Sequence, residues 1–238
     1  MASEILALRG IGYLRRRVFD WIADVGRVMM LLGDFFRLIV PGLSSLRLLV
    51  DQLAAVGVGS LWLVFVVSLF TGAVAAVQAA YQFSSVVPLK YISSVILRSV
   101  IIELGPVLTA LVVGGRVGAS IAAELGTMRV TEQVDALRAM AINPVRYLVV
   151  PRVAAAIIMM PILTLYADAV AVFGGYVVAV TSIGVSTHVY VSGLKEFFFY
   201  KDLFSGLLKA VFFGGIIGLM GCYHGVATEG GAEGVGQA

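Results

Sequence analysis

Two acidic residues of this sequence lie inside long apolar runs, where an ionised side chain is expensive. Glu103 falls within the apolar stretch 91–118, and Asp168 falls within a later one. A carboxylate at membrane depth needs a cation, a polar cavity or a proton to offset its lost hydration. Glu103 therefore either lines a polar route for a substrate or forms a structural ion pair with Arg98 or Arg116.

A second group of charges interrupts the apolar pattern between residues 124 and 152. Within it, apolar side chains recur at helical spacing along one face: Val134, Leu137 and Ala141. Charged side chains occupy another face: Glu132, Asp135 and Arg138. Thr131 can cap the start of this helix, and Asn143-Pro144 ends it. We expect a coupling helix over about residues 124–141 that receives force from an external ATPase, the alternative being a helix that lies on the membrane surface.

The sequence motifs of the common catalytic and metal-binding classes are absent. Neither G-x-x-x-x-G-K-[ST] nor G-x-G-x-x-G occurs, so we expect no ATP hydrolysis by this chain. Cys222 and His224 flank one tyrosine and His188 stands alone, which is too few ligands for a metal site. No Ser/His/Asp or paired-carboxylate arrangement indicates hydrolysis. We therefore expect no catalytic residue, no metal and no cofactor in the chain itself.

The composition indicates the elements that must position these residues. Of 238 residues, 60% are apolar and 13% are charged, and the mean hydropathy is +1.01, whereas roughly a quarter of a soluble domain is charged. Soluble enzymes and nucleic-acid-binding proteins are thereby excluded. Four apolar runs are long enough to cross a bilayer: about 53–81, 91–118, 147–183 and 203–223.

The third run is too long for a simple crossing. As a helix from Tyr147 it would measure roughly 55 Å, against a ~30 Å hydrocarbon core. It is either one tilted helix with an extramembrane extension or a short hairpin. We favour the single helix because no polar residue accompanies the Gly174-Gly175 pair.

Glycines four residues apart recur in the apolar runs. Three such pairs occur: Gly114 and Gly118, Gly214 and Gly218, and Gly221 and Gly225. This spacing lets helix backbones approach closely where lipid supplies no hydrophobic driving force. We expect these glycines to pack helices together.

The first 50 residues predict interfacial helices. Apolar residues recur in steps of three and four from Ile11 to Phe36, with charged residues on the other faces, before Pro41-Gly42 turns the chain. The alternative is a soluble amphipathic helix packed on a partner. Seven of the seventeen Lys and Arg residues fall in the first 47 positions, so the N-terminus and the loop 116–152 are expected on the cytoplasmic side.

Three segments resemble one protein family. Residues 122–152, AAELGTMRVTEQVDALRAMAINPVRYLVVPR, resemble the signature of the MlaE/YrbE-type permeases of lipid-transporting ABC systems. Residues 103–120, ELGPVLTALVVGGRVGAS, and residues 224–238, HGVATEGGAEGVGQA, are similar to the same family. The resemblance covers most of the chain from about residue 30.

The resemblance implies an all-α integral membrane protein, a polytopic helical bundle with residues 1–238 forming one permease domain. It implies a homodimer in the bacterial inner membrane that moves phospholipid or a related lipid between membranes. Cytoplasmic ABC ATPase subunits would bind ATP and Mg²⁺, and an MCE-domain carrier would bind on the far side. In such permeases a further apolar span follows GAEGVG, so the intact protein is expected to have five spans, the last beyond residue 238.

The resemblance also implies functional residues at the positions of this sequence that match the family's motifs. The ATPase contact would involve Glu124, Thr131, Glu132, Asp135, Leu137 and Arg138. The lipid route would be lined by Val77, Gln78, Tyr81, Glu103 and Leu104. A different class stays open, an ion-coupled transporter or channel that uses Glu103 and Asp168 as intramembrane carboxylates. Copurification with a Walker-motif ATPase separates the two hypotheses.

Overall fold

The computed structural model describes residues 2–42, 46–82, 90–228 and positions 231, 234 and 236. Every regular element in these residues is a helix. Four helical segments are long and apolar enough to cross a membrane: Leu46–Gln82, Tyr91–Val130, Val145–Thr181 and Tyr200–Ala227. The expected all-α polytopic fold is confirmed. The expected final span beyond residue 238 lies outside the described residues.

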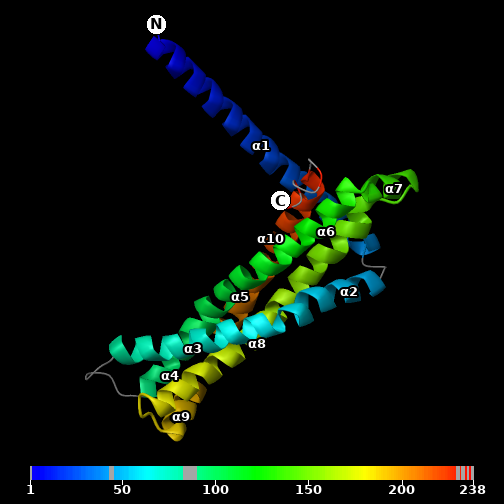
Figure 1. Ribbon diagram of the computed structural model, residues 1–238. Coiled ribbons are helices and arrows are strands. Elements are labelled where there is room, and N and C mark those ends of the chain that lie inside the picture. The colour runs from blue at the N-terminus through cyan, green and yellow to red at the C-terminus, as the bar shows by residue number, and fades with distance from the viewer. Residues whose placement is uncertain are drawn as a thin grey trace.

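The N-terminal helix α1 (Ala2–Gly42) projects away from the bundle as one long rod (Figure 1). It ends at the predicted Pro41-Gly42 turn. Among its described side chains, Ile22, Met29 and Phe36 of the predicted apolar stripe are exposed. The chain's own bundle therefore does not cover this stripe, and its placement on a membrane surface stays a prediction.

The first membrane segment consists of two helices joined by one 3₁₀ turn. These elements are α2 (Leu46–Gly57), the turn Val58–Ser60 and α3 (Leu61–Gln82). Together they cover 37 residues, about 55 Å as a helix, which exceeds a ~30 Å hydrocarbon core. The segment begins before the predicted residue 53, so α2 extends beyond the thickness of the bilayer.

The second segment is one helical path with two wider turns. It comprises α4 (Lys90–Ser99), a π-helical turn at Val100–Leu104, α5 (Gly105–Val113), a second π-helical turn at Gly114–Gly118, and α6 (Ala119–Val130). It continues past the predicted end at residue 118. Glu103 and Arg116 each lie on one of the π-helical turns, which often accompany functional sites.

The predicted coupling helix over residues 124–141 is wrong at its start. Residues 124–130 continue α6, and the chain then bends at Glu132, whose φ of 60° is left-handed. The short helix α7 (Gln133–Ala139) follows, and Ala141 has a second left-handed φ of 59°. A left-handed residue interrupts the hydrogen-bond ladder of a right-handed helix. Helical periodicity alone does not reveal such a break.

The third segment is one helix, as favoured from the sequence. A π-helical turn at Val145–Val149 leads into α8 (Val150–Thr181), which continues through Pro161 and Gly174-Gly175. No hairpin occurs there. A Cβ on Gly174 would lie 2.3 Å from the carbonyl oxygen of Leu69, so this glycine allows α8 and α3 to pack closely.

The last two described helices are α9 (Thr187–Phe197), which is short, and α10 (Tyr200–Ala227), which runs back along the bundle. A Cβ on Gly214 would lie 2.5 Å from the carbonyl oxygen of Ala156 in α8. A Cβ on Gly221 would lie 3.0 Å from a carbonyl oxygen of the second segment. The predicted packing role of the glycine pairs is therefore confirmed on α10.

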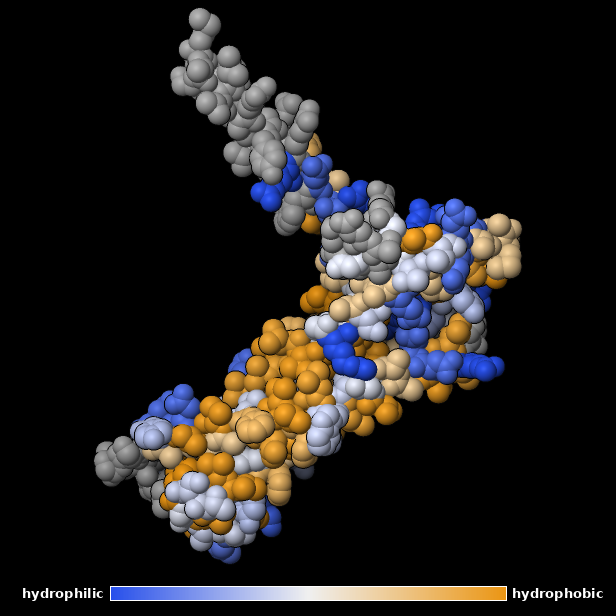
Figure 2. All heavy atoms as spheres, in the orientation of Figure 1, coloured by the Kyte–Doolittle hydropathy of each residue, from blue (hydrophilic) through white to orange (hydrophobic). Residues whose placement is uncertain are grey.

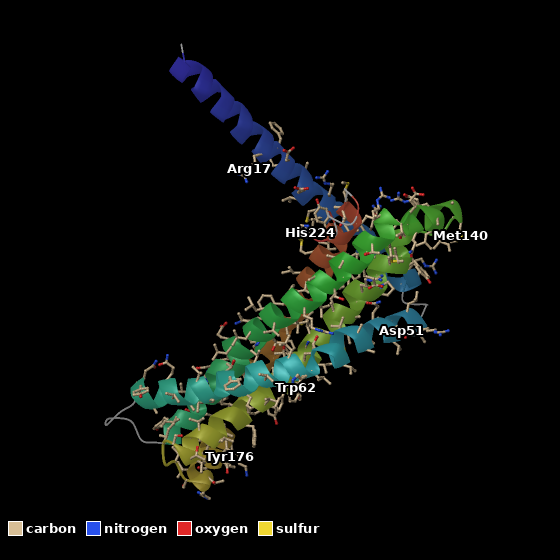
Figure 3. The ribbon with its side chains drawn as sticks, in the orientation of Figure 1. Arg17, Asp51, Trp62, Met140, Tyr176 and His224 are labelled. Carbon is tan, nitrogen blue, oxygen red and sulfur yellow. The ribbon has the colours of Figure 1, made fainter. Side chains whose placement is uncertain are left out.

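The bundle has two chemically different ends. The α7 end, marked by Met140 in Figure 3, carries many hydrophilic residues, whereas hydrophobic residues dominate the surface of the middle of the bundle (Figure 2). The α9 end, marked by Tyr176, lies opposite (Figure 3). One buried cluster around Leu125 fills the α7 half, and a second around Ile96 fills the α9 half.

Candidate functional site

A groove of about 650 Å³ lies between α3, α4 and α5. None of its lining side chains is charged. Gln78, Gln82 and Ser99 place polar groups toward the α9 end, where α3 finishes, and side chains such as Phe70 and Leu108 make the rest of the wall mainly apolar. A mainly apolar groove with a few polar groups, Thr71 among them, matches the polarity of an amphiphile.

The structure divides the predicted lipid-route residues between different surfaces. Gln78 and Leu104 line the groove. Val77 and Tyr81 are exposed on α3 but are not lining residues. Glu103 lies on the π-helical turn and faces α10 instead. The groove therefore contains two of the five predicted residues.

The cation that binds Glu103 is Lys209 of α10, not the predicted Arg98 or Arg116. Lys209 Nζ lies 2.6 Å from Glu103 Oε1, and the two side chains are 35% and 62% exposed in the single chain. The sequence contained a signal for this partner, because Lys209 is the one charged residue between 203 and 223. An acidic residue within one membrane span is stabilised by a basic residue within another.

Pro106 explains why the lysine reaches this turn. Proline has no N–H, so it cannot donate to the carbonyl oxygen of Ile102, four residues earlier. Lys209 Nζ donates to that oxygen at 3.1 Å as well as to Glu103. Gly206 lets α10 approach, since a Cβ there would lie 2.2 Å from the carbonyl oxygen of Ile101. The ammonium thus binds a carboxylate and a carbonyl oxygen left without its helical donor.

The two arginines mark two levels along the second segment. Arg98 Nε donates to Asp202 at 2.9 Å, and its guanidinium carbon lies 5.6 Å from the centre of the Phe199 ring. Arg116 Nη1 donates to Ser60 Oγ at 3.0 Å, at the turn between α2 and α3. The helical path between the arginines is about 27 Å, close to the ~30 Å of a hydrocarbon core.

At the α7 end an ion pair connects α6 and α8. Arg152 Nη2 lies 2.6 Å from Glu124 Oε1, and the Arg152 side chain is 6% exposed whereas that of Glu124 is 53% exposed. Arg152 Nη1 also donates to the carbonyl oxygen of Leu148 at 2.8 Å. Glu124, predicted to contact the ATPase, therefore balances a buried guanidinium within the chain.

The apolar ridge of α7 faces the chain's own core. Val134 is 1% exposed, and Leu137 is half-buried against the same cluster. Of the predicted ridge, Val134 is therefore not free to enter a partner's groove, whereas Ala141 is exposed, and contact of Leu137 with a partner stays a prediction. Thr131 does not cap α7; its hydroxyl donates to the carbonyl oxygen of Thr127, and Glu132 occupies the N-cap position.

The charged face of α7 remains exposed. Arg129 Nη1 donates to both oxygens of Asp135 at 3.0 Å, and Arg138 Nη1 donates to Oδ1 at 3.0 Å. Met140 and Ile142 beside them are exposed. Arg129, which lies on α6, was not among the six residues named for the predicted contact.

A polar cluster connects α1 to the end of α10. The hydroxyl of Tyr223 donates to Asp24 Oδ1 at 2.6 Å, and Arg27 contacts both Asp24 and the tyrosine oxygen, the latter at 3.3 Å. These hydrogen bonds, that of Arg27 above all, hold the pKa of Asp24 below its ordinary value. The cluster stabilises the angle at which α1 leaves the bundle.

Asp168, the second predicted intramembrane acid, has a different environment from Glu103. It lies on α8 and is 5% exposed. Neither of its carboxyl oxygens has a hydrogen-bond partner in the described chain. The two predicted acids therefore do not form one common site.

Comparisons with known proteins agree with this architecture. The model of the permease MlaE family matches residues 49–238. A probable ABC transporter permease protein of Rickettsia prowazekii (strain Madrid E) is 46% identical over 193 residues, 81% of this chain and 74% of that relative. One from Synechocystis is 38% identical over 218 residues, 92% of this chain and 83% of the relative. Protein TRIGALACTOSYLDIACYLGLYCEROL 1, chloroplastic, of Arabidopsis thaliana is 34% identical over 211 residues, 89% of this chain and 60% of the relative.

The matched region contains the groove, the ion pairs of the membrane segments and α7. The match extends over most of the chain, and the bacterial relatives carry the same permease description. The resemblance found in the sequence is thereby confirmed. The chain belongs to the MlaE family of ABC transporter permeases.

Proposed function

We propose that this permease moves a phospholipid or related lipid between membranes, driven by separate ATPase subunits that bind ATP and Mg²⁺. The groove between α3, α4 and α5 carries the proposal. Its apolar wall suits acyl chains, and Gln78, Gln82 and Ser99 can hydrogen-bond a headgroup at its α9 end. The plant relative, which is named after a galactolipid, supports a lipid substrate.

The positions of Arg98 and Arg116 along the second segment indicate how the protein lies in the bilayer. Trp62, exposed close to the Arg116 level, and Tyr200, exposed beside Asp202, are residues of the kind that concentrate at membrane interfaces. With the hydrocarbon core between these levels, α1 and α7 lie beyond one face of it. We assign that face to the cytoplasm of a bacterial inner membrane, because the basic residues of the N-terminal segment and the 116–152 loop gather there.

The ATPase is proposed to bind the exposed charged face of α7. Asp135 is held between Arg129 and Arg138, and Met140 and Ile142 add apolar contact area. Charges fix the register of such a contact, and apolar side chains supply its affinity. Val134 and Leu137 then transmit the force inward, because they pack on the core.

A second copy of the chain is proposed to cover the Glu103–Lys209 pair. Both side chains are partly exposed in the single chain although they lie between the two arginine levels. An ion pair facing hydrocarbon is costly, so a protein surface is expected over it. A homodimer supplies that surface, and Val77 and Tyr81 are likewise available to it. An MCE-domain carrier is proposed at the α9 end, where the groove's polar side chains lie.

The alternative of an ion-coupled transporter receives less support. It requires Glu103 and Asp168 on one path, but Glu103 binds Lys209 and Asp168 is buried separately. The family to which the chain belongs is one of ABC permeases. Reconstitution with the ATPase separates the two: lipid transfer that depends on ATP supports the proposal, and ATP-independent ion flux by the chain alone contradicts it.

The groove is tested by filling it. Ala75 lines the groove, and Val77, two residues further along α3, does not. Ala75→Phe should lower ATP-dependent transfer of a fluorescent phospholipid between vesicles by about tenfold, the equivalent of ~1.4 kcal/mol of lost lipid binding. Val77→Phe adds the same bulk outside the groove, and a larger loss of transfer for Ala75→Phe than for Val77→Phe supports the groove as the route. Equal transfer by Ala75→Phe and the wild type contradicts the groove as the route.

A further inference from the structure

Three buried oxygens on one face of α8 lack hydrogen-bond partners in the described chain. They are both carboxyl oxygens of Asp168 and the hydroxyl of Thr164. The residues are four apart, so their side chains are stacked on one face of the helix. The Thr164 side chain is completely buried and that of Asp168 nearly so. Buried polar groups are normally hydrogen-bonded, so this cluster requires an explanation.

Gly105 shows that the carboxyl group is enclosed by protein. A Cβ on Gly105 would lie 1.8 Å from Asp168 Oδ1 and 3.0 Å from the carbonyl oxygen of Val100. Only a residue without a side chain lets the backbone of α5 close over this carboxyl group. The contact lies where the π-helical turn passes into α5. The packing of α5 on α8 therefore seals Asp168 from water.

In the described chain, no cation on the surrounding helices donates a hydrogen bond to Asp168. α3 and α5 contain no charged residue. Glu103 on the π-helical turn binds Lys209 of α10, and Arg98 of α4 binds Asp202 of α10. The other titratable side chains described on α4, α8 and α10 make no hydrogen bond to Asp168: Tyr91, Arg152, Tyr166, Tyr176, Tyr200, Lys201, Cys222, Tyr223 and His224.

We propose that Asp168 is a proton-binding site whose occupancy is coupled to the contact between α5 and α8. While the helices are packed, the side chain is a neutral carboxylic acid, because a carboxylate without partners would be strongly disfavoured there. When α5 separates from α8, water reaches the group, the O–H bond breaks and the proton passes to water. This inference does not depend on the transported substrate.

A small cavity lies beside the contact of Gly105 with α8. It measures about 10 Å³, close to the smallest volume that holds one water molecule, and adjoins Gly105 and Ala167, the neighbour of Asp168. The hydroxyl-bearing residues Ser68, Thr71 and Thr109 also line it. A modest widening of this cavity would therefore bring hydrogen-bonding groups and water to the carboxyl group.

The first experiment is infrared spectroscopy of the full chain in lipid nanodiscs at neutral pH. The carbonyl band of a protonated carboxylic acid should be present in the wild type and absent in Asp168→Asn and Asp168→Leu. Glu103→Gln is the matched control and should keep the band, because Glu103 is ion-paired. Two replacements are used because the buried amide of asparagine could itself disturb folding. A band that survives both Asp168 replacements, or is missing from the wild type, overturns the proposal.

The second experiment tests the coupling to helix packing. Amide hydrogen exchange of residues 105–113 is followed while the pH is raised, and each rate is divided by the intrinsic base-catalysed rate at that pH to give a protection factor. In the wild type, protection should fall over the same pH range in which the infrared band disappears. In Asp168→Leu the protection factors should stay constant. Loss of the band without a fall in protection, or an equal fall in Asp168→Leu, overturns the coupling.

Discussion

The two ends of this permease are held together by different forces. At the α7 end, charged groups join helices that are distant in the sequence, through Arg152 with Glu124 and Asp24 with Tyr223. Toward the α9 end, aromatic packing accompanies one such ion pair, Arg98 with Asp202. There Tyr190 of α9 packs against Tyr176 of α8 with ring centres 5.5 Å apart. Between them, α3 packs on α8 through glycines, and the groove opens beside α3.

The contrast indicates that the two regions have different roles. Directional ion pairs fix angles between helices, which suits a surface that receives force from an ATPase. Apolar contacts are non-directional and tolerate small shifts, which suits walls that must accommodate lipids of varied shape. The largest mutational effects are therefore expected from buried charge at the α7 end and from close backbone packing along α3.

Glu124→Ala should have the largest effect on stability. It leaves the guanidinium of Arg152 buried without its carboxylate, and removing one partner of a buried pair costs about 3–5 kcal/mol. Because Glu124 is half-exposed, we expect a loss of about 3 kcal/mol in the free energy of unfolding. Denaturant titration in detergent measures it. Asp135→Ala, which breaks exposed ion pairs on α7, should lower the free energy of unfolding by less than ~1 kcal/mol. Equal losses for the two variants would contradict the expected difference between buried and exposed ion pairs.

Gly72→Ala should have the next largest effect. A Cβ there would lie 1.7 Å from the carbonyl oxygen of Ala171, so α3 and α8 must move apart. Overpacking of this kind costs roughly 1–3 kcal/mol, and we expect about 2 kcal/mol. Gly26→Ala in α1 is the control, since no atom lies within 4 Å of its added Cβ. A destabilised Gly26→Ala together with an unchanged Gly72→Ala would contradict the close packing of α3 on α8.

Leu137→Asp tests which way the ridge of α7 faces. Since Leu137 packs on the permease core, the replacement should lower the chain's own stability by about 1–2 kcal/mol, less than full burial would give. Arg138→Ala should instead leave stability unchanged and weaken capture of the ATPase in a pull-down. If Leu137→Asp unfolds like the wild type but no longer binds the ATPase, the ridge contacts the ATPase and not the permease core.

The smallest effect concerns the angle of α1 and its pH dependence. The folded pKa of Asp24 is lowered, so the cluster with Arg27 and Tyr223 is fully effective above the ordinary value of 3.8. It weakens as the pH falls through the lowered folded value. Distances between spin labels on α1 and α10 should thus stay constant from neutral pH to about pH 4 and broaden only below it. Asp24→Asn should show the broad distribution at neutral pH; an unchanged distribution would exclude a role for Asp24.

Much of the membrane architecture could be predicted because it follows from local composition. Apolar runs of sufficient length identified the four segments, and the absence of polar residues near Gly174-Gly175 correctly favoured one helix in the third. Helical periodicity predicted the amphipathic character of α7 but not that Glu124 belongs to α6. A left-handed residue such as Glu132 leaves no periodic signal, so the bend between the helices was missed.

The sequence by itself determined the membrane class, the four apolar segments, the end of α1 at Pro41-Gly42 and the family, since these depend on composition, spacing and motif. The tertiary structure alone decided which charges meet. Lys209 lies 106 positions from Glu103 and was paired with it only by the packing of α10 on the π-helical turn. Gly105 and Asp168 likewise meet only because α5 closes on α8. Such contacts depend on which faces of two helices pack together, and a helix's periodicity specifies its apolar face without specifying its neighbour.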